Sequence, residues 1–216
     1  MSSLVLKAIA LISMIVDHYG AVFQPWELSF RIVGRLAFPI YCFLLVEGFF
    51  HTKNINKYGL RLAAFSIISE IPFDYAFFGG LNWSHQNVFF TLFIGLSAMA
   101  ILEEYKYSKA YIKALIIVAT CIIAAILKTD YSYIGILYIL SFYFTYNMPK
   151  VKRLLLVFAV LYFVNMFSGS FVQQYSLLAL IPLMLYSGAP GTKNKIVQIL
   201  FYAAYPLHLF LFALIK

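Results

Sequence analysis

Residues 4–23, LVLKAIALISMIVDHYGAVF, decide the fold class of this chain. The run is long enough to cross a bilayer as one helix, since about 17–25 predominantly apolar residues span the hydrocarbon core. Near its end it nevertheless carries Asp17 and His18. Ionisable groups at such a depth are costly unless they face a bundle interior or a wet cavity. The stretch therefore predicts a membrane-spanning helix that contributes to a functional site.

Composition extends this interpretation to the whole chain. Hydrophobic residues make up 63% of its 216 residues and charged residues only 11%, whereas a soluble domain is about half apolar. Further apolar runs occupy residues 30–50, 58–78, 86–102, 110–127, 131–147, 152–168, 173–187 and 195–215. We therefore predict an all-α fold, a polytopic transmembrane helical bundle of about nine spans, with residues 1–216 forming one domain.

The basic residues indicate how this bundle sits in a membrane. Most of the 16 Lys and Arg side chains fall on one side of the predicted spans, and the other side receives only Arg31, Arg35, Lys128 and Lys216. This positive-inside asymmetry places the N-terminus in the cytoplasm and the C-terminus outside, in a multi-pass protein of a cell membrane. The net charge of +8 then reflects topology and contact with anionic membrane lipid. No nucleic-acid partner is expected.

Polar residues gather at two depths when the spans are drawn antiparallel. Near the outer face lie Asp17, His18, Arg31, Arg35, Glu70, Asp74, His85, Gln86, Asn87, Asp130, Tyr131, Gln173, Gln174 and His208. Near the inner face lie Glu47, His51, Lys53, Asn54, Lys57 and Arg61. Because most of these unusual residues converge on one leaflet, the pattern predicts a site there.

Two pairs in the outer layer have the spacing of one helix face. Arg31 and Arg35 are four residues apart, as are Glu70 and Asp74, so each pair forms a stripe. If the two helices are antiparallel neighbours, the outer residues Arg31 and Asp74 meet, and the deeper Arg35 meets Glu70 in a bidentate contact. The outer contact is equally compatible with a structural ion pair, whereas the deeper one favours a role in the site. Pro72 should kink its helix.

His18 is the side chain best suited to chemistry, because imidazole takes and returns a proton near neutral pH. Adjacent helical residues diverge by about 100°, so Asp17 need not contact His18 and can instead pair with an arginine. His208 is either a second member of the site or is hydrogen-bonded to a carbonyl freed by Pro206.

The two cysteines carry no signal for a metal or a redox site. Cys42 and Cys121 lie in apolar stretches and are expected to be small buried side chains. Neither a Cys-x-x-Cys motif nor a paired-histidine spacing occurs, so no metal is predicted.

Several motifs together resemble one known family. They are Leu6-Lys-x-Ile-Ala, Met14-x-x-Asp17-His18-x-Gly20, Arg31-x-x-Gly34-Arg35-Leu-Ala-Phe-Pro39, Leu44-Leu-Val-Glu47-Gly48-Phe-x-His51-Thr52, Lys57-Tyr58-x-x-Arg61-Leu, Ser69-Glu70-Ile-Pro72-Phe-Asp74, His85-Gln86-Asn87-Val-Phe-Phe-Thr91 and Phe201-Tyr202-x-x-Tyr205-Pro206-x-His208-Leu. Over essentially its whole length the chain is similar to the TraX family, whose named member acetylates the N-terminus of conjugative pilin. TraX proteins in turn resemble larger transmembrane acyltransferases that modify cell-surface glycans. In those a histidine at the end of the first span is catalytic, and that match falls on His18.

The resemblance implies an integral membrane acyltransferase, which transfers acetyl from cytoplasmic acetyl-CoA to an extracytoplasmic protein, peptide or glycan acceptor. His18 would act as general base or acyl carrier, and Arg35 would stabilise the oxyanion. Glu70 or Asp17 would orient the imidazole. The acceptor would meet Arg31, Asp74, His85, Gln86, Asn87 and His208. Acetyl-CoA would meet Glu47, His51, Lys53 and Arg61 at the inner face.

Two other classes of protein stay open at this point. A proton-coupled transporter also uses buried Asp, Glu and His residues, although no inverted repeat is visible and the carboxylates gather in one leaflet. A non-catalytic assembly factor would use the same polar residues only to hold helices together. For the inner basic residues, plain anchoring to lipid headgroups is an equally good interpretation.

Overall fold

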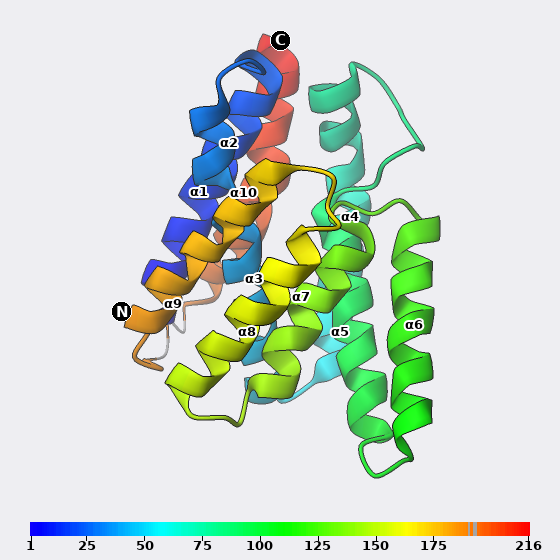
Figure 1. The fold of residues 1–216 in the computed structure, drawn as a ribbon. Helices are drawn as coiled ribbons and strands as arrows, with labels where there is room; N and C mark the ends of the chain where they lie inside the picture. Colours follow the sequence, from blue (N-terminus) through cyan, green and yellow to red (C-terminus); the bar gives the residue numbers. More distant parts are fainter. Residues whose placement is uncertain (190, 192–193) are drawn as a thin grey trace.

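The computed structural model describes residues 1–189, 191 and 194–216. Apart from an isolated bridge between Gln86 and Thr129, the regular elements of this part of the chain are helical. They are α1 (Ser3–Phe23), α2 (Leu28–Gly34), α3 (Ala37–His51), α4 (Ile55–Phe78), α5 (Val88–Glu104), α6 (Ala110–Ile126), α7 (Ser132–Thr145), α8 (Lys150–Asn165), the 3-10 helix η1 (Phe171–Ala179), α9 (Leu180–Leu185) and α10 (Lys195–Ile215) (Figure 1). The predicted all-α fold is confirmed.

The predicted second span, residues 30–50, consists of two helices. α2 ends at Gly34 and α3 begins at Ala37. Pro39 explains the break, because it lacks a backbone N–H and its ring excludes a helical carbonyl four residues earlier, at Arg35. Arg35 therefore lies at a turn between two helices rather than inside a continuous one.

The predicted eighth span, residues 173–187, is also not one regular α-helix. It begins within η1 and continues as α9 from Leu180. α4, in contrast, runs unbroken through Pro72, and α10 runs unbroken through Pro206. The predicted boundaries of the remaining spans agree with the observed helices to within a few residues.

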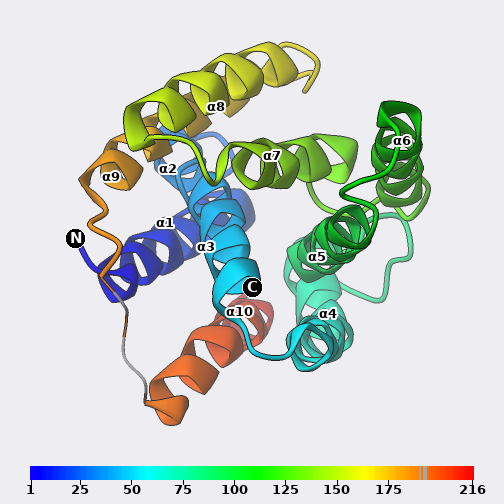
Figure 2. The same cartoon turned by 90° about the horizontal axis from the view of Figure 1, so that it is seen from below.

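α3 occupies the centre of the bundle. Seen from below, α1, α4, α5, α7 and α10 surround it, whereas α6 lies at the periphery against α5 and α7 (Figure 2). Ile40, Cys42 and Val46 on α3 are fully buried. The expectation of a small buried side chain is thus confirmed for Cys42, but Cys121 on α6 is only partly buried.

Two helical stretches in the described residues have both the length and the apolar composition to cross a membrane, Ser3–Phe23 and Leu28–His51. The shorter apolar helical stretches are Ala110–Ile126, Ser132–Thr145, Phe171–Leu185 and Ile199–Ile215. The arrangement of nine spans stays a prediction.

Candidate functional site

Asp17 on α1 holds two arginines at once. Its Oδ2 accepts a hydrogen bond from Nη1 of Arg31 at 2.7 Å, and its two carboxylate oxygens accept from Nη2 of Arg35 at 2.7 and 2.8 Å. Only 12% of the Asp17 side chain and 13% of the Arg35 side chain are exposed. Gly34 permits the close approach, because a Cβ there would lie 2.1 Å from Oδ1 of Asp17. We call Asp17, Arg31 and Arg35 the arginine clamp.

The clamp shows that the predicted pairing of these arginines with Glu70 and Asp74 is wrong. α4, which carries both of those carboxylates, packs mainly against α10 and α5, whereas α2 packs mainly against α1. The two α4 carboxylates instead organise the connection to α5. Glu70 accepts hydrogen bonds from the side-chain amide and the backbone N–H of Asn87, and Asp74 accepts one from the backbone N–H of Asn82 at 2.9 Å.

Every nitrogen of the Arg35 guanidinium is engaged. Beyond its contact with Asp17, Nε donates to the carbonyl of Arg31 at 3.3 Å, and Nη1 donates to Oε1 of Gln173 at 3.1 Å. The guanidinium carbon also lies 5.8 Å from the ring centroid of Tyr131. Arg35 is therefore committed to holding helices together, which argues against the oxyanion role expected for it.

His18 and His208 form a buried pair, which we call the histidine dyad. Nδ1 of His18 lies 2.7 Å from Nε2 of His208, and Nδ1 of His208 lies 2.7 Å from the carbonyl oxygen of Ala204. A carbonyl oxygen only accepts, so Nδ1 of His208 carries a proton and Nε2 of the neutral ring is an acceptor. Nδ1 of His18 then donates to it. This leaves Nε2 of His18 with a free lone pair.

Aromatic rings surround the dyad, and the lone pair on Nε2 of His18 has no hydrogen-bond donor among the described residues. The edges of Phe77 and Tyr205 pack against the His18 ring, with centroid distances of 5.4 and 5.7 Å. The group that orients His18 is thus His208, and the expectation that Asp17 or Glu70 does so is wrong.

The hydrogen bond of His208 also differs from the expected one. Pro206 removes the N–H that would bond to the carbonyl of Tyr202, four residues earlier. His208 contacts the carbonyl of Ala204 instead, one turn before its own position. Its bond to a backbone carbonyl is confirmed, but the proline does not explain it.

An inner hollow of about 400 Å³ lies between α1, α3, α4, α5 and α10. Of the residues predicted to bind the cofactor, His51 and Arg61 line this hollow, whereas Glu47 and Lys53 are not among its lining residues. Lys7 on α1 adds a further basic side chain. Toward the dyad the lining becomes apolar and aromatic. The inner hollow thus has a basic part and an apolar part.

An outer hollow of about 680 Å³ lies on the other side of the clamp. Its lining includes Arg31 and Arg35, with Asp130 and His85 from two connecting loops. Nε2 of His85 lies 3.7 Å from Oδ1 of Asp130, and this contact raises the pKa of the loop histidine above its usual value. The other residues predicted to bind the acceptor are not among the lining residues of this hollow: Asp74, Gln86, Asn87 and His208.

The position of residues along α1 relates the two hollows to the dyad. Met14 lines the inner hollow and Ala21 lines the outer one, with Asp17 and His18 between them. Ala21 follows Met14 by seven positions, which is about 10 Å of helix at 1.5 Å per residue. Asp17 and His18 therefore lie on α1 between the levels of the two hollows, and neither residue lines either hollow.

The comparison with known sequences identifies the family. The sequence profile of the family described as "TraX protein" matches residues 2–216. The chain belongs to the TraX family. A protein of Dichelobacter nodosus named as a probable fimbrial assembly protein FimC, serogroup H1, is 41% identical over 112 residues, which cover 46% of each chain. An uncharacterized protein of Rickettsia prowazekii (strain Madrid E) is 33% identical over 66 residues, 31% of this chain and 25% of its own.

This TraX chain covers less than half the length of either curated relative. No solved structure matches the chain.

Sequence reasoning missed several residues of the site in this TraX chain. Tyr58, Tyr202 and Tyr205 line the inner hollow, but their aromatic rings look like ordinary core packing in the sequence. The sequence predicts that Gln173 lies in the same layer as Arg35. It does not predict their hydrogen bond, because the two residues are 138 positions apart. The three tyrosines do carry one signal, because each stands in a family motif beside Arg61 or His208.

Proposed function

We propose that this TraX protein is an integral membrane acyltransferase that moves acetyl from cytoplasmic acetyl-CoA to an extracytoplasmic amine or hydroxyl. The observation that carries the proposal is the free lone pair on Nε2 of His18, fixed by the hydrogen-bond chain through His208 to the Ala204 carbonyl. A buried imidazole held in one tautomer is suited to act as a general base.

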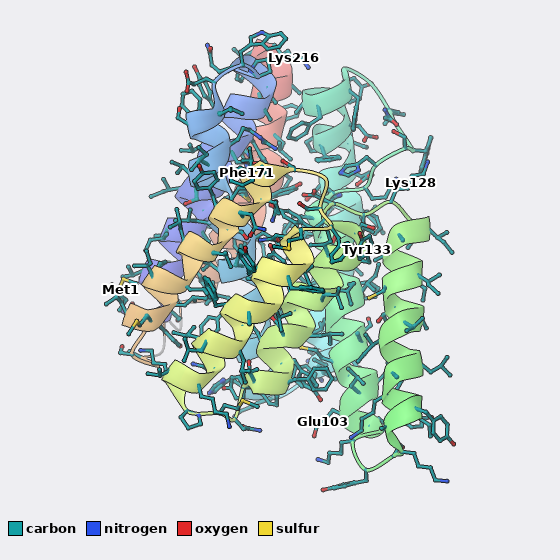
Figure 3. All side chains as sticks on the ribbon, viewed as in Figure 1. Met1, Glu103, Lys128, Tyr133, Phe171 and Lys216 are labelled. Atoms are coloured by element: carbon teal, nitrogen blue, oxygen red, sulfur yellow. The ribbon has the colours of Figure 1, made fainter. Side chains whose placement is uncertain are left out.

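The exposed surface supports a multi-pass arrangement. On the peripheral helix α6, 66% of Leu115, 52% of Ile122 and 72% of Ile126 are exposed. Contiguous apolar surface of this kind is unfavourable in water but matches the hydrocarbon of a bilayer. Figure 3 places Glu103 and Lys216 at opposite ends of the molecule, as the predicted topology requires.

The inner hollow suits the acyl donor. Acetyl-CoA carries several negative charges at its nucleotide end and a long neutral arm that ends in the thioester. Lys7, His51 and Arg61 supply positive charge in the hollow, and its apolar part reaches Tyr205 beside the dyad. This arrangement supports a donor whose nucleotide stays at the basic part while its thioester approaches His18.

The transfer follows from these positions. Nε2 of His18 accepts a proton as the acceptor nitrogen or oxygen attacks the thioester carbon. The new bond to the acyl carbon forms, the carbon–sulfur bond breaks, and the proton passes to the leaving thiolate to give free CoA thiol. His208 keeps the lone pair of His18 directed at the reacting group.

The family and one relative suggest the kind of acceptor. TraX membership and similarity to a probable fimbrial assembly protein support a pilin or fimbrial subunit whose free amine reaches the outer hollow. Asp130, which is partly exposed in that hollow, offers a carboxylate that can accept a hydrogen bond from an approaching amine N–H. The acceptor and the donor would then meet at the layer that contains His18.

The test uses purified protein in lipid nanodiscs with radiolabelled acetyl-CoA and two acceptors, a synthetic peptide with a free N-terminus and an envelope extract. The wild type should release CoA thiol and label an acceptor, whereas His18→Ala should lose about 10²-fold or more in rate because its general base is gone. Thr120→Ala removes another buried polar side chain, on the peripheral helix α6 and outside the lining of both hollows, and should transfer at the wild-type rate. An assembly factor would label no acceptor with any variant.

A further inference from the structure

Tyr205 on α10 has a buried hydroxyl whose hydrogen no described residue accepts. Only 3% of the residue is exposed, and the backbone N–H of Val88 is directed at the oxygen of the hydroxyl, which leaves its hydrogen unpaired. Four other described residues have a buried side-chain atom without a hydrogen-bond partner: Ser69, Glu70, Asp74 and Arg153. None of these four lines the inner hollow, whereas Tyr205 does. The donor hydrogen of Tyr205 is thus available inside the proposed donor site.

The position of the ring ties this hydroxyl to the dyad. The Tyr205 ring meets His18 and His208 edge-on, each with a centroid distance of 5.7 Å, and meets Phe89 in the same way at 5.2 Å. Three packed rings fix the orientation of the phenol. A buried hydroxyl hydrogen without an acceptor costs free energy, and such unpaired groups in a native protein call for an explanation in function or bound ligand.

We propose that the hydroxyl of Tyr205 is a catalytic hydrogen-bond donor to the carbonyl oxygen of the acyl thioester. This inference rests on the proposed acyl transfer and adds the group that stabilises its oxyanion. Arg35, the residue expected to do so, has every guanidinium nitrogen engaged with Asp17, Arg31 or Gln173, whereas Tyr205 keeps a free donor beside the general base.

The chemistry requires such a donor. As the acceptor attacks, the thioester carbonyl oxygen gains negative charge, and a preorganised donor there stabilises the transition state more than the ground state. Tyr205 keeps its proton throughout. When the carbon–sulfur bond breaks and the carbonyl re-forms, the hydrogen bond weakens again. His18 handles the proton and Tyr205 stabilises the oxyanion, so the two roles lie on adjacent rings.

The experiment compares Tyr205→Phe with two matched substitutions. Tyr138→Phe removes a buried hydroxyl that is bonded to Asn165 and Ser176, and Tyr75→Phe removes one from an exposed side chain on α4. Tyr205→Phe should lower kcat about 10²–10³-fold, the usual effect of losing an oxyanion donor, with KM for acetyl-CoA little changed. Its Tm should fall less than that of Tyr138→Phe, because the Tyr205 hydroxyl donates to no described residue whereas the Tyr138 hydroxyl contacts two side chains. Tyr75→Phe should change neither.

A second measurement does not depend on the acceptor. With acetyl-CoA carrying carbon-13 at its carbonyl, the infrared carbonyl band of the bound donor should shift to higher frequency in Tyr205→Phe, because a hydrogen bond lowers that frequency. An unmoved band, a kcat within about threefold of wild type, or a fall in Tm like that of Tyr138→Phe would overturn the assignment of Tyr205 alone. Wild-type protein that neither binds the labelled donor nor releases CoA thiol would overturn the acyl transfer as well.

Discussion

The chemistry proposed for this protein depends on one nitrogen atom, Nε2 of His18. Its protonation state is not set by a neighbouring carboxylate, as in a serine-protease triad, but by a second imidazole that is itself fixed by a backbone carbonyl. This arrangement brings no net negative charge to the base. This neutral hydrogen-bond chain from His18 through His208 to the Ala204 carbonyl suits a buried site, because burying an additional unpaired carboxylate would cost free energy.

Substitution of His208 tests this hydrogen-bond chain at the residue scale. His208→Leu removes the acceptor for Nδ1–H of His18, so the tautomer is no longer fixed, and we expect kcat to fall on the order of 10²-fold with KM for acetyl-CoA little changed. His208→Gln should recover part of that loss, because its amide oxygen can accept the same hydrogen bond. Nitrogen NMR of labelled histidine should show protonated Nδ1 on His18 in the wild type and a mixture of tautomers in His208→Leu. Equal activity of the Leu and Gln variants would contradict a positioning role.

At the scale of elements, one turn of α1 serves two purposes. Consecutive helical residues diverge by about 100°, so Asp17 faces α2 and closes the arginine clamp while His18 faces α10 and closes the dyad. The clamp joins α1, α2 and, through Gln173, η1. It therefore fixes the depth and rotation of α1, and with them the position of His18.

A double-mutant cycle checks the clamp. Breaking one half of a buried ion pair costs about 3–5 kcal/mol, and we expect Asp17→Asn to lower the free energy of unfolding near the bottom of that range because Arg31 is 30% exposed. Asp17→Asn and Arg35→Met should be strongly non-additive, since each removes the same contact. The pair Glu70→Gln and Arg35→Met is the control and should be additive within about 0.5 kcal/mol. Coupling between Arg35 and Glu70, measured by urea or thermal unfolding in detergent, would contradict the observed pairing.

The sequence predicted where the helices lie along the chain, and which polar residues share a level, better than it predicted which helices pack against one another. Apolar runs and antiparallel order were enough to bring Asp17, Arg31, Arg35 and His208 to one level. Spacing within a helix shows which residues lie on one face of that helix, but not which other helix the face contacts. The predicted partner of Arg35, Glu70, is therefore wrong, and the observed partner is Asp17. The contact of His18 with His208 spans 190 positions. No local pattern encodes such a contact, because it depends on how α1 and α10 pack.

At the scale of the whole molecule, the outer hollow reaches deep into the bundle. α7 has 14 residues and α5 has 17, whereas α4 has 24. At 1.5 Å per residue, α7 is about 15 Å shorter than α4. Figure 3 shows Tyr133, which lines the outer hollow, near mid-height and far below Lys216. The first turn of the short helix α7 therefore lines the outer hollow at this level.

The predicted topology makes the two hollows accessible from opposite sides of the membrane. In a background without Cys42 and Cys121, Ser168→Cys in the outer hollow and Ser84→Cys in the α4–α5 loop should react with a membrane-impermeant thiol reagent in intact cells. Thr52→Cys in the inner hollow and Lys109→Cys at the start of α6 should react only after the cells are opened. The positive-inside distribution of basic residues is the reason for this expectation. Labelling of Ser168→Cys and Thr52→Cys from the same side would show that both hollows open to one compartment, and a transfer across the membrane would then have no path.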